Sequence, residues 1–225
     1  LPGQDVTLSP SLTISRFGQE TPFGQPYGGA PWNYSGTAGD SYGDASHSNA
    51  SANVTPYPAH VVDWVLVTVR ENTLQPTGNV WQCAGWVHEN GEITFPDACP
   101  LTLDPAATYY VVVEHRNHLA VLDEATLAVG GAYLAKDFTT QNSFAPRFRF
   151  GQKEIAPGVW VMFAGNGDQT TSRNSINSSD RTLWRNFQGF RGYNPGDHSN
   201  TGVTGSGDET IWKNNQNKTS GIRFN

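Results

Sequence analysis

The stretch VVDWVLVTV, residues 61–69, decides the fold class of this chain. Its β-branched and aromatic residues run without a helical period over a length typical of strands, so it predicts a buried β-strand. A second run, YYVVVEH at residues 109–115, predicts another central strand. Between the two, residues 81–88 and 92–95 flank the turn signal Glu89-Asn90-Gly91, and this arrangement predicts a β-hairpin.

Weaker strand signals and the overall composition extend this prediction to the whole chain. Shorter apolar runs follow at residues 127–129, 132–138 and 146–150. The 225 residues include 24 Gly and 14 Pro, and only 15% are charged, which is typical of β-structure with many loops. We predict a mainly β protein, a β-sandwich of the immunoglobulin-like or jelly-roll-like kind, with a small C-terminal pair of calcium loops and short helices.

Composition divides the chain into three regions. Residues 1–58 combine an N-terminal strand signal with a long loop rich in Gly, Ser and aromatic residues. Residues 59–164 hold the predicted sandwich core, and residues 165–225 hold a duplicated motif. The N-terminal signal is an apolar alternation interrupted at Pro10, and it predicts one or two strands. Its apolar residues are Val6, Leu8, Leu12, Ile14 and Phe17.

The long loop of the first region carries aromatic side chains within a polar sequence. A disordered segment would be poor in aromatic residues, so we predict an ordered loop. Exposed aromatic rings offer flat apolar faces on which a sugar can stack, which makes this loop a candidate glycan-binding surface. The candidate stacking residues are Tyr27, Trp32, Tyr34 and Tyr42.

Charge, hydropathy and cysteine usage indicate the setting in which the chain works. A net charge of −6 with scattered Lys and Arg argues against a nucleic-acid partner. The sequence has no run of 18 apolar residues, so it does not predict a membrane-spanning helix. The chain begins at Leu1 rather than Met, and we interpret this as removal of a secretory signal. Cys83 and Cys99 bracket the predicted hairpin turn and predict a disulfide, the alternative being two free buried thiols. Together these features predict an extracellular or cell-surface protein.

The C-terminal region contains an internal duplication. DRTLWRN at residues 180–186 returns as DETIWKN at residues 208–214, an offset of 28 (208 − 180). Asp, Thr, an aliphatic residue, Trp, a cation and Asn recur at matching positions, which marks a repeated structural unit.

The loop before each copy has the residue spacing of a calcium site. In the second loop, oxygen-bearing groups fall at positions 1, 3, 5, 7 and 12, with Gly202 at position 6 for the sharp turn. The predicted ligands there are Asp197, Ser199, Thr201, the carbonyl of Val203, and Asp208. The first loop has one inserted residue by the same count, and its predicted ligands are Asp168, Thr170, Ser172, Asn174 and Asp180. The alternative is a pair of polar turns that cap two short helices and bind nothing.

These loops resemble the dockerin variant of the EF-hand, in which a calcium loop followed by one helix is duplicated. More widely, several strings resemble a family of secreted Bacteroidetes proteins described only as hypothetical or haemagglutinin-like. The strings are APWNYSG at residues 30–36, VVDWVLV at 61–67, YYVVVEHRNHLAV at 109–121 and the two repeated copies, so the resemblance covers about residues 22 to 222. It implies secretion, a β-sandwich and calcium loops, and it implies no catalytic activity.

The sequence favours a non-enzymatic function. No Gly-x-Ser-x-Gly elbow and no phosphate-binding loop occur, and His115 and His118 lack an evident third metal ligand nearby. We therefore predict a structural or adhesive surface protein that is stabilised by Ca²⁺ and self-associates into a fibre by N-terminal strand addition, or binds another cell-surface protein. The alternatives are a glycan-binding module and a dockerin-like assembly module.

Overall fold

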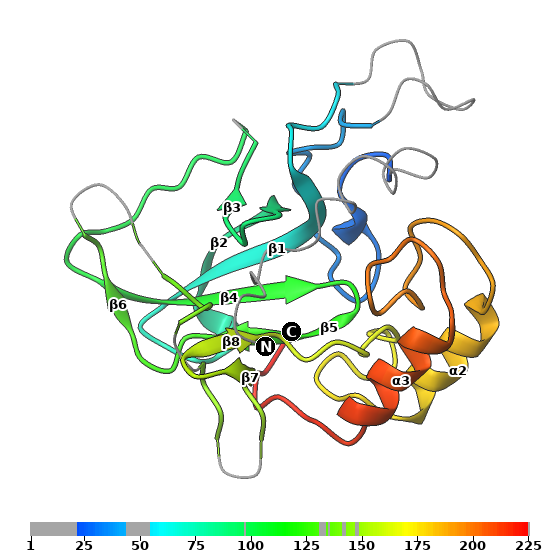
Figure 1. Ribbon diagram of the computed structural model, residues 1–225. Helices are drawn as coiled ribbons and strands as arrows, with labels where there is room; N and C mark the ends of the chain where they lie inside the picture. Colours follow the sequence, from blue (N-terminus) through cyan, green and yellow to red (C-terminus); the bar gives the residue numbers. More distant parts are fainter. Residues whose placement is uncertain are drawn as a thin grey trace.

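The computed structural model describes residues 22–43, 55–96, 98–130, 134, 136–140, 143–146 and 149–224. Its centre is a six-stranded antiparallel sheet in the order β3-β2-β1-β4-β5, with β6 paired to β4 (Figure 1). The strands are β1 (Val61–Glu71), β2 (Asn79–His88), β3 (Ile93–Thr94), β4 (Thr108–His115), β5 (His118–Leu122) and β6 (Leu127–Ala128). The mainly β prediction, with antiparallel pairing, is confirmed, and so is the hairpin of β2 and β3.

The decisive stretch forms β1, the central strand. Its first ten residues are all buried, because it pairs with β2 on one side and β4 on the other and is covered on both faces. Alternate side chains point to opposite faces of a strand. Val65 and Val67 therefore share one face, and Trp64 and Leu66 share the other.

The valine face of the sheet consists of Val65, Val67, Val111, Val113 and Val121, which form one buried cluster. Phe138 and Met162 pack against this cluster from the polypeptide that follows β6. A short second sheet, β7 (Lys153–Ala156) paired with β8 (Val159–Val161), belongs to the same part of the chain. The predicted strands 132–138 and 146–150 are not strands in their described residues. Their backbone groups form other hydrogen bonds: the Gln152 side chain donates to Phe138 O, and Phe150 N donates to Thr219 O.

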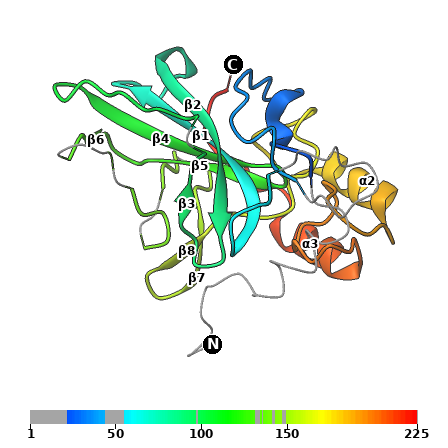
Figure 2. The same ribbon diagram turned by 90° about the horizontal axis from the view of Figure 1, so that it is seen from above.

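The opposite face, which we call the tryptophan face, is centred on Trp64, Leu66, Ala84 and Trp86. The N-terminal segment covers it with Tyr27 and Tyr34, so the first region shares its core with the sheet. Farther along the same face, Ile222 packs on Val112, Ala120 and Leu122. Figures 1 and 2 show the N-terminal segment and the two helices at the same end of the sheet.

The remaining elements are short. The helices are α2 (Ser178–Phe187) and α3 (Ser206–Asn215), with 3₁₀ turns η2 (Pro26–Gly28) and η3 (Pro76–Gly78). None of the described helices has the length and apolar character needed to cross a membrane. Cys83 and Cys99 form the predicted disulfide, with their Cα atoms 6.1 Å apart. It joins β2 to the segment after β3.

Candidate metal centre

The duplicated motif folds as two loop–helix units that repeat each other's capping contacts. Asp180 Oδ2 accepts a hydrogen bond from Asn177 N, and Asp208 Oδ2 accepts one from Gly205 N, both at 2.7 Å. Each Asp is the third residue of its helix and stabilises the unpaired N–H groups of the first turn. The other carboxylate oxygen of each Asp is turned into the preceding loop.

Five oxygen-bearing groups converge in the second loop. The Ser199 hydroxyl lies 2.7 Å from Asp208 Oδ1, 3.1 Å from Thr201 Oγ1 and 3.2 Å from Asp197 Oδ1. The Thr201 hydroxyl lies 3.1 Å from the carbonyl oxygen of Val203 and 3.3 Å from Asp197 Oδ1. The structure thus brings together every group that the spacing of this loop selects as a calcium ligand.

The charge of this cluster suits a hard cation. Asp197 and Asp208 are 2% and 1% exposed, and no Lys or Arg of the described chain lies within ion-pair distance of either carboxylate. Two buried carboxylates without a cation are costly, and calcium prefers six to eight oxygen ligands of this kind. No group of three or more His, Cys, Asp or Glu side chains surrounds a metal position in the described residues. Hydroxyl and carbonyl oxygens would therefore supply many of the ligands.

The first loop brings together only part of its predicted ligand set. Thr170 Oγ1 lies 2.7 Å from Asp168 Oδ1, and Asp168 N donates to Asp180 Oδ1 at 2.8 Å. Ser172 instead bonds the hydroxyl of Ser175, and Asn174 is exposed. Among the described residues no hydrogen bond joins either side chain to Asp168 or Asp180, so the contacts do not support Ser172 and Asn174 as ligands.

Asn166 is a better candidate for the first ligand position of this loop. Asp168 N donates to Asp180 Oδ1 as Ser199 N donates to Asp208 Oδ1, so Asp168 corresponds to position 3 and Asn166 to position 1. Asn166 is fully buried, and its Oδ1 has no hydrogen-bond partner among the described residues. A buried, unpaired carbonyl oxygen at this position fits a calcium ligand.

The sequence repeat predicts the same ligand positions when they are counted back from the helix. Ser175 lies 28 residues before Val203, the offset of the repeat, so Ser175 corresponds to position 7. The loop from Asn166 to Ser175 is then three residues longer than the loop from Asp197 to Val203 (175 − 166 = 9 against 203 − 197 = 6). In this register Asn166, and not Asp168, is the candidate for position 1. Burial raises the pKa of Asp180 to about 6, despite the backbone N–H groups of Asn177 and Asp168 that favour its charged form. A bound cation would reverse this effect.

The two units hold each other through a reciprocal pair of indoles. Trp184 Nε1 donates to the carbonyl of Gly205, the residue that precedes α3, at 2.9 Å. Trp212 Nε1 donates to the carbonyl of Asn177, the residue that precedes α2, at 2.8 Å. Both indoles are buried, and Trp212 also packs on Leu119 of β5. Each tryptophan therefore connects its helix to the end of the other unit's loop.

The turn between β4 and β5 anchors both loops to the sheet. Arg116 Nη1 donates to Asn194 O at 2.5 Å, and Asn117 Nδ2 donates to Asp197 O at 2.5 Å, so this turn contacts the second loop. From the first loop, Gln169 Nε2 donates to His115 O at 2.6 Å. A metal bound in either loop would therefore stabilise a segment that is joined directly to the central sheet.

Two of the four candidate stacking residues, Tyr27 and Tyr34, occupy the core instead of a binding surface. Tyr27 is fully buried and its hydroxyl donates to Trp64 O, and Tyr34 is 9% exposed. The prediction of ligand stacking is wrong for these two residues, because a ring without exposed surface cannot stack on a sugar. Trp32 and Tyr42 are partly buried and pack against the same cluster. The apolar character of these rings is explained by the tryptophan face that they cover.

Comparison with known proteins gives little. No protein-family model matches the chain, and no curated protein matches it. Two crystal structures of a type II cohesin–X–dockerin complex from Acetivibrio cellulolyticus, an N-terminal and a C-terminal interface mutant, are similar at 17% and 18% identity. Their TM-scores are 0.38 and 0.37, over 70% and 68% of this chain and 82% of each matched chain. Similarity at this level assigns neither a family nor a function, and the resemblance to secreted Bacteroidetes proteins stays a prediction.

Proposed function

We propose that this protein is a non-enzymatic structural component of the extracellular surface that binds Ca²⁺ in its C-terminal loops and self-associates. The observation that carries the proposal is the convergence of Asp197, Ser199, Thr201, Val203 and Asp208 oxygens in the second loop. Bound calcium would neutralise the buried carboxylates and fix the helix pair against the β4–β5 turn. Its role would be mechanical stabilisation of one end of the sheet.

The buried ionisable groups near this end support a structural role. Asp63 accepts hydrogen bonds from Arg116 and from the Tyr193 hydroxyl, and its carboxylate lies 3.1 Å from His115 Nε2. Glu114 pairs with Arg173 at 2.7 Å. Each of these groups connects the sheet to a neighbouring segment, which is the arrangement of residues that hold a fold together. Asp63, His115 and Glu114 are thus occupied in interior contacts.

Calcium titration tests the metal part of the proposal. For the whole protein, calorimetry should show calcium binding in the weak range of extracellular modules, with Kd on the order of 10⁻⁴–10⁻³ M. Calcium at a hundredfold excess over Kd should stabilise the fold by about 2.7 kcal/mol for one site, seen as a rise in Tm that EGTA reverses. Asp197→Asn/Asp208→Asn should remove this response at the second loop.

The matched control is Glu124→Gln, which removes one exposed carboxylate outside the loops and should leave the calcium response unchanged. No binding heat at millimolar calcium and no change in Tm would overturn the metal part. Self-association is tested separately by sedimentation velocity and negative-stain electron microscopy with calcium and after chelation. Ordered assemblies that fray in chelator are expected, and a protein that stays monomeric in both conditions would overturn this part.

A further inference from the structure

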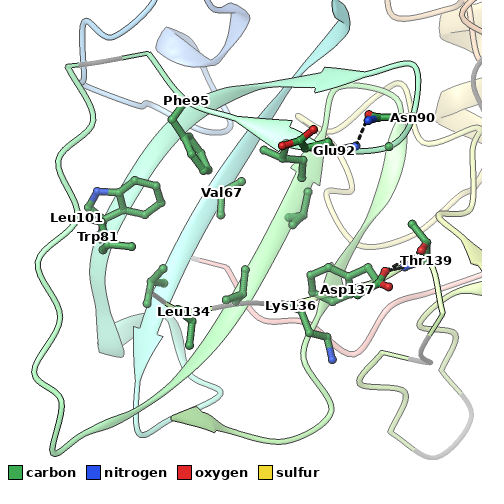
Figure 3. Close-up of a pocket in the computed structure, with 16 residues that line it drawn as sticks. Val67, Trp81, Asn90, Glu92, Phe95, Leu101, Leu134, Lys136, Asp137 and Thr139 are labelled. Carbon is green, nitrogen blue, oxygen red and sulfur yellow. Dashed lines mark hydrogen bonds between the residues drawn. The ribbon is translucent and has the colours of Figure 1, made fainter. Parts of the chain in front are cut away.

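An open apolar groove crosses the valine face of the sheet. Its floor consists of Val67, Val69, Val111 and Val113, and its volume is about 530 Å³. Figure 3 shows Trp81, Phe95, Leu101 and Leu134 arranged around Val67. Trp81, Phe95, Leu101, Leu134 and Phe138 are among the other residues that line it. Phe95 and Leu101 are 36% and 40% exposed, so apolar surface remains uncovered by the described residues.

A strand edge borders this groove. β3 pairs with β2 through Trp86–Thr94 and Val87–Ile93, and among the described strands it has no partner on its other side. Ile93 and Phe95 themselves line the groove. An extended peptide in the groove could bury its own apolar side chains against the valine face. Its backbone could pair with the outer edge of β3.

The chain contains a segment with the matching pattern. From residue 6 to residue 14 every even position is apolar, and every odd position from 7 to 15 is Ser or Thr. The apolar positions are Val6, Leu8, Pro10, Leu12 and Ile14. As a strand, these nine residues would span roughly 30 Å with one apolar face and one hydroxyl face. Pro10 is compatible with an edge position, where one missing N–H donor is tolerated.

We infer that the groove on the valine face binds residues 6–14 of a second copy of this chain as an added strand. The inference rests on the proposed self-association and names its interface. The position of Pro22, the first described residue, favours a second copy over the chain's own segment as the source of this strand. Pro22 O accepts a hydrogen bond from Tyr57, which packs on the tryptophan face, on the far side of the sheet. Only residues 15–21 separate Pro22 from this segment, and seven residues reach at most about 25 Å.

Two full-length variants separate the strand from the groove. Leu8→Ser/Leu12→Ser removes apolar anchors of the strand and keeps the groove. Phe95→Asp/Leu101→Asp places charge on the groove wall and keeps the strand, and because both side chains are partly exposed the fold should survive. Each variant alone should stay monomeric in sedimentation velocity, with at least a tenfold loss of assembly. An equal mixture of the two should form a 1:1 complex and nothing larger, because only one strand–groove pair remains functional.

The control is Val80→Asp/Ile155→Asp, which charges two positions, 50% and 48% exposed, that do not line the groove, and it should assemble like the wild type. Cooperative thermal unfolding of every variant confirms folding. A wild type that assembles while the mixture stays monomeric would overturn the groove assignment and leave the proposed function standing. A wild type that is monomeric at all concentrations would overturn self-association itself. If, in that monomer, the strand and groove variants lowered stability equally, the groove would hold the chain's own segment.

Discussion

Arg116 Nη2, in the β4–β5 turn, lies 3.1 Å from Asp63 Oδ2, near the start of β1, and both side chains are buried. The same guanidinium donates to Asn194 O and to Asn200 Oδ1 in the second loop. Burial by itself would raise the pKa of Asp63, but the charges of Arg116 and His115 outweigh it and hold the pKa below its ordinary value. One ion pair therefore joins the central strand to the candidate metal centre.

Removing the cation of this pair should be strongly destabilising. Arg116→Met leaves the buried Asp63 carboxylate with a weaker counter-charge and removes both hydrogen bonds to the loop. We expect a loss of about 3–5 kcal/mol in the free energy of unfolding, measured by urea denaturation. Arg181→Met is the control, because its pair with Glu209 is partly exposed and should change stability little. Equal effects of the two variants would contradict a dominant contribution of the buried pair to stability.

Adding a carboxylate to the first loop should tighten its calcium binding. Asn166→Asp gives position 1 the residue type that Asp197 supplies in the second loop, and calcium affinity rises with the number of charged ligands. We expect at least a threefold lower Kd at the first loop by calorimetry, with lower stability in EGTA because the new charge is buried. Ser172→Ala is the matched control and should leave affinity unchanged. A larger effect of Ser172→Ala would restore the ligand set that direct counting suggests.

The sheet could be predicted from the sequence where side-chain pattern and burial agree. β1 and β4 are mostly apolar, with the runs Trp64–Val67 and Val111–Val113, and a strand buried on both faces favours such runs. The structure of the segment after β6 was harder to predict. Phe138, for example, packs on the valine face, but its backbone carbonyl accepts a hydrogen bond from a side chain and not from a neighbouring strand. Local pattern does not distinguish these two causes of apolar character.

The candidate metal centre was predictable to the extent that its ligands are close in sequence. The second loop follows a fixed spacing, so its five candidate ligands could be predicted directly. The first loop has insertions, and only contacts across the loop identify Asn166 as the equivalent of Asp197. The anchoring of both loops by Arg116 and Asn117 was not predictable, because about eighty residues separate those side chains from Asn194 and Asp197.

Stability should fall in mild acid because His118 is held neutral. Burial, together with the charges of His115 and Arg116, lowers the pKa of His118 well below its usual value. The unfolded chain then binds more protons than the folded one below about pH 6.5, so stability is complete above that pH and falls as pH decreases. Each pH unit should cost up to about 1.4 kcal/mol for this group.

Urea unfolding at pH 7.5 and pH 5.0 measures this dependence. The difference in unfolding free energy between the two pH values should be smaller in His118→Gln than in the wild type, while groups common to both proteins cancel. An unchanged slope in His118→Gln would show that this histidine does not control acid stability.

The packing of the N-terminal segment on the sheet depends on a glycine. Gly39 has a φ of +87°, and a Cβ there would overlap the indole of Trp64, the centre of the tryptophan face. Gly39→Ala should therefore combine the cost of a left-handed backbone, about 1–2 kcal/mol, with displacement of Trp64.

Gly29→Ala is the matched control, because Gly29 has a φ of −93° and no atom lies within 4 Å of the position that a Cβ would occupy. We expect Gly39→Ala to lower the unfolding free energy by at least about 2 kcal/mol and Gly29→Ala to leave it nearly unchanged or slightly higher. Tryptophan fluorescence during urea unfolding reports both stability and the environment of Trp64. If Gly39→Ala were as stable as Gly29→Ala, the segment before residue 43 would not be held on the sheet as the structure has it, and the tryptophan face would be free to meet another partner.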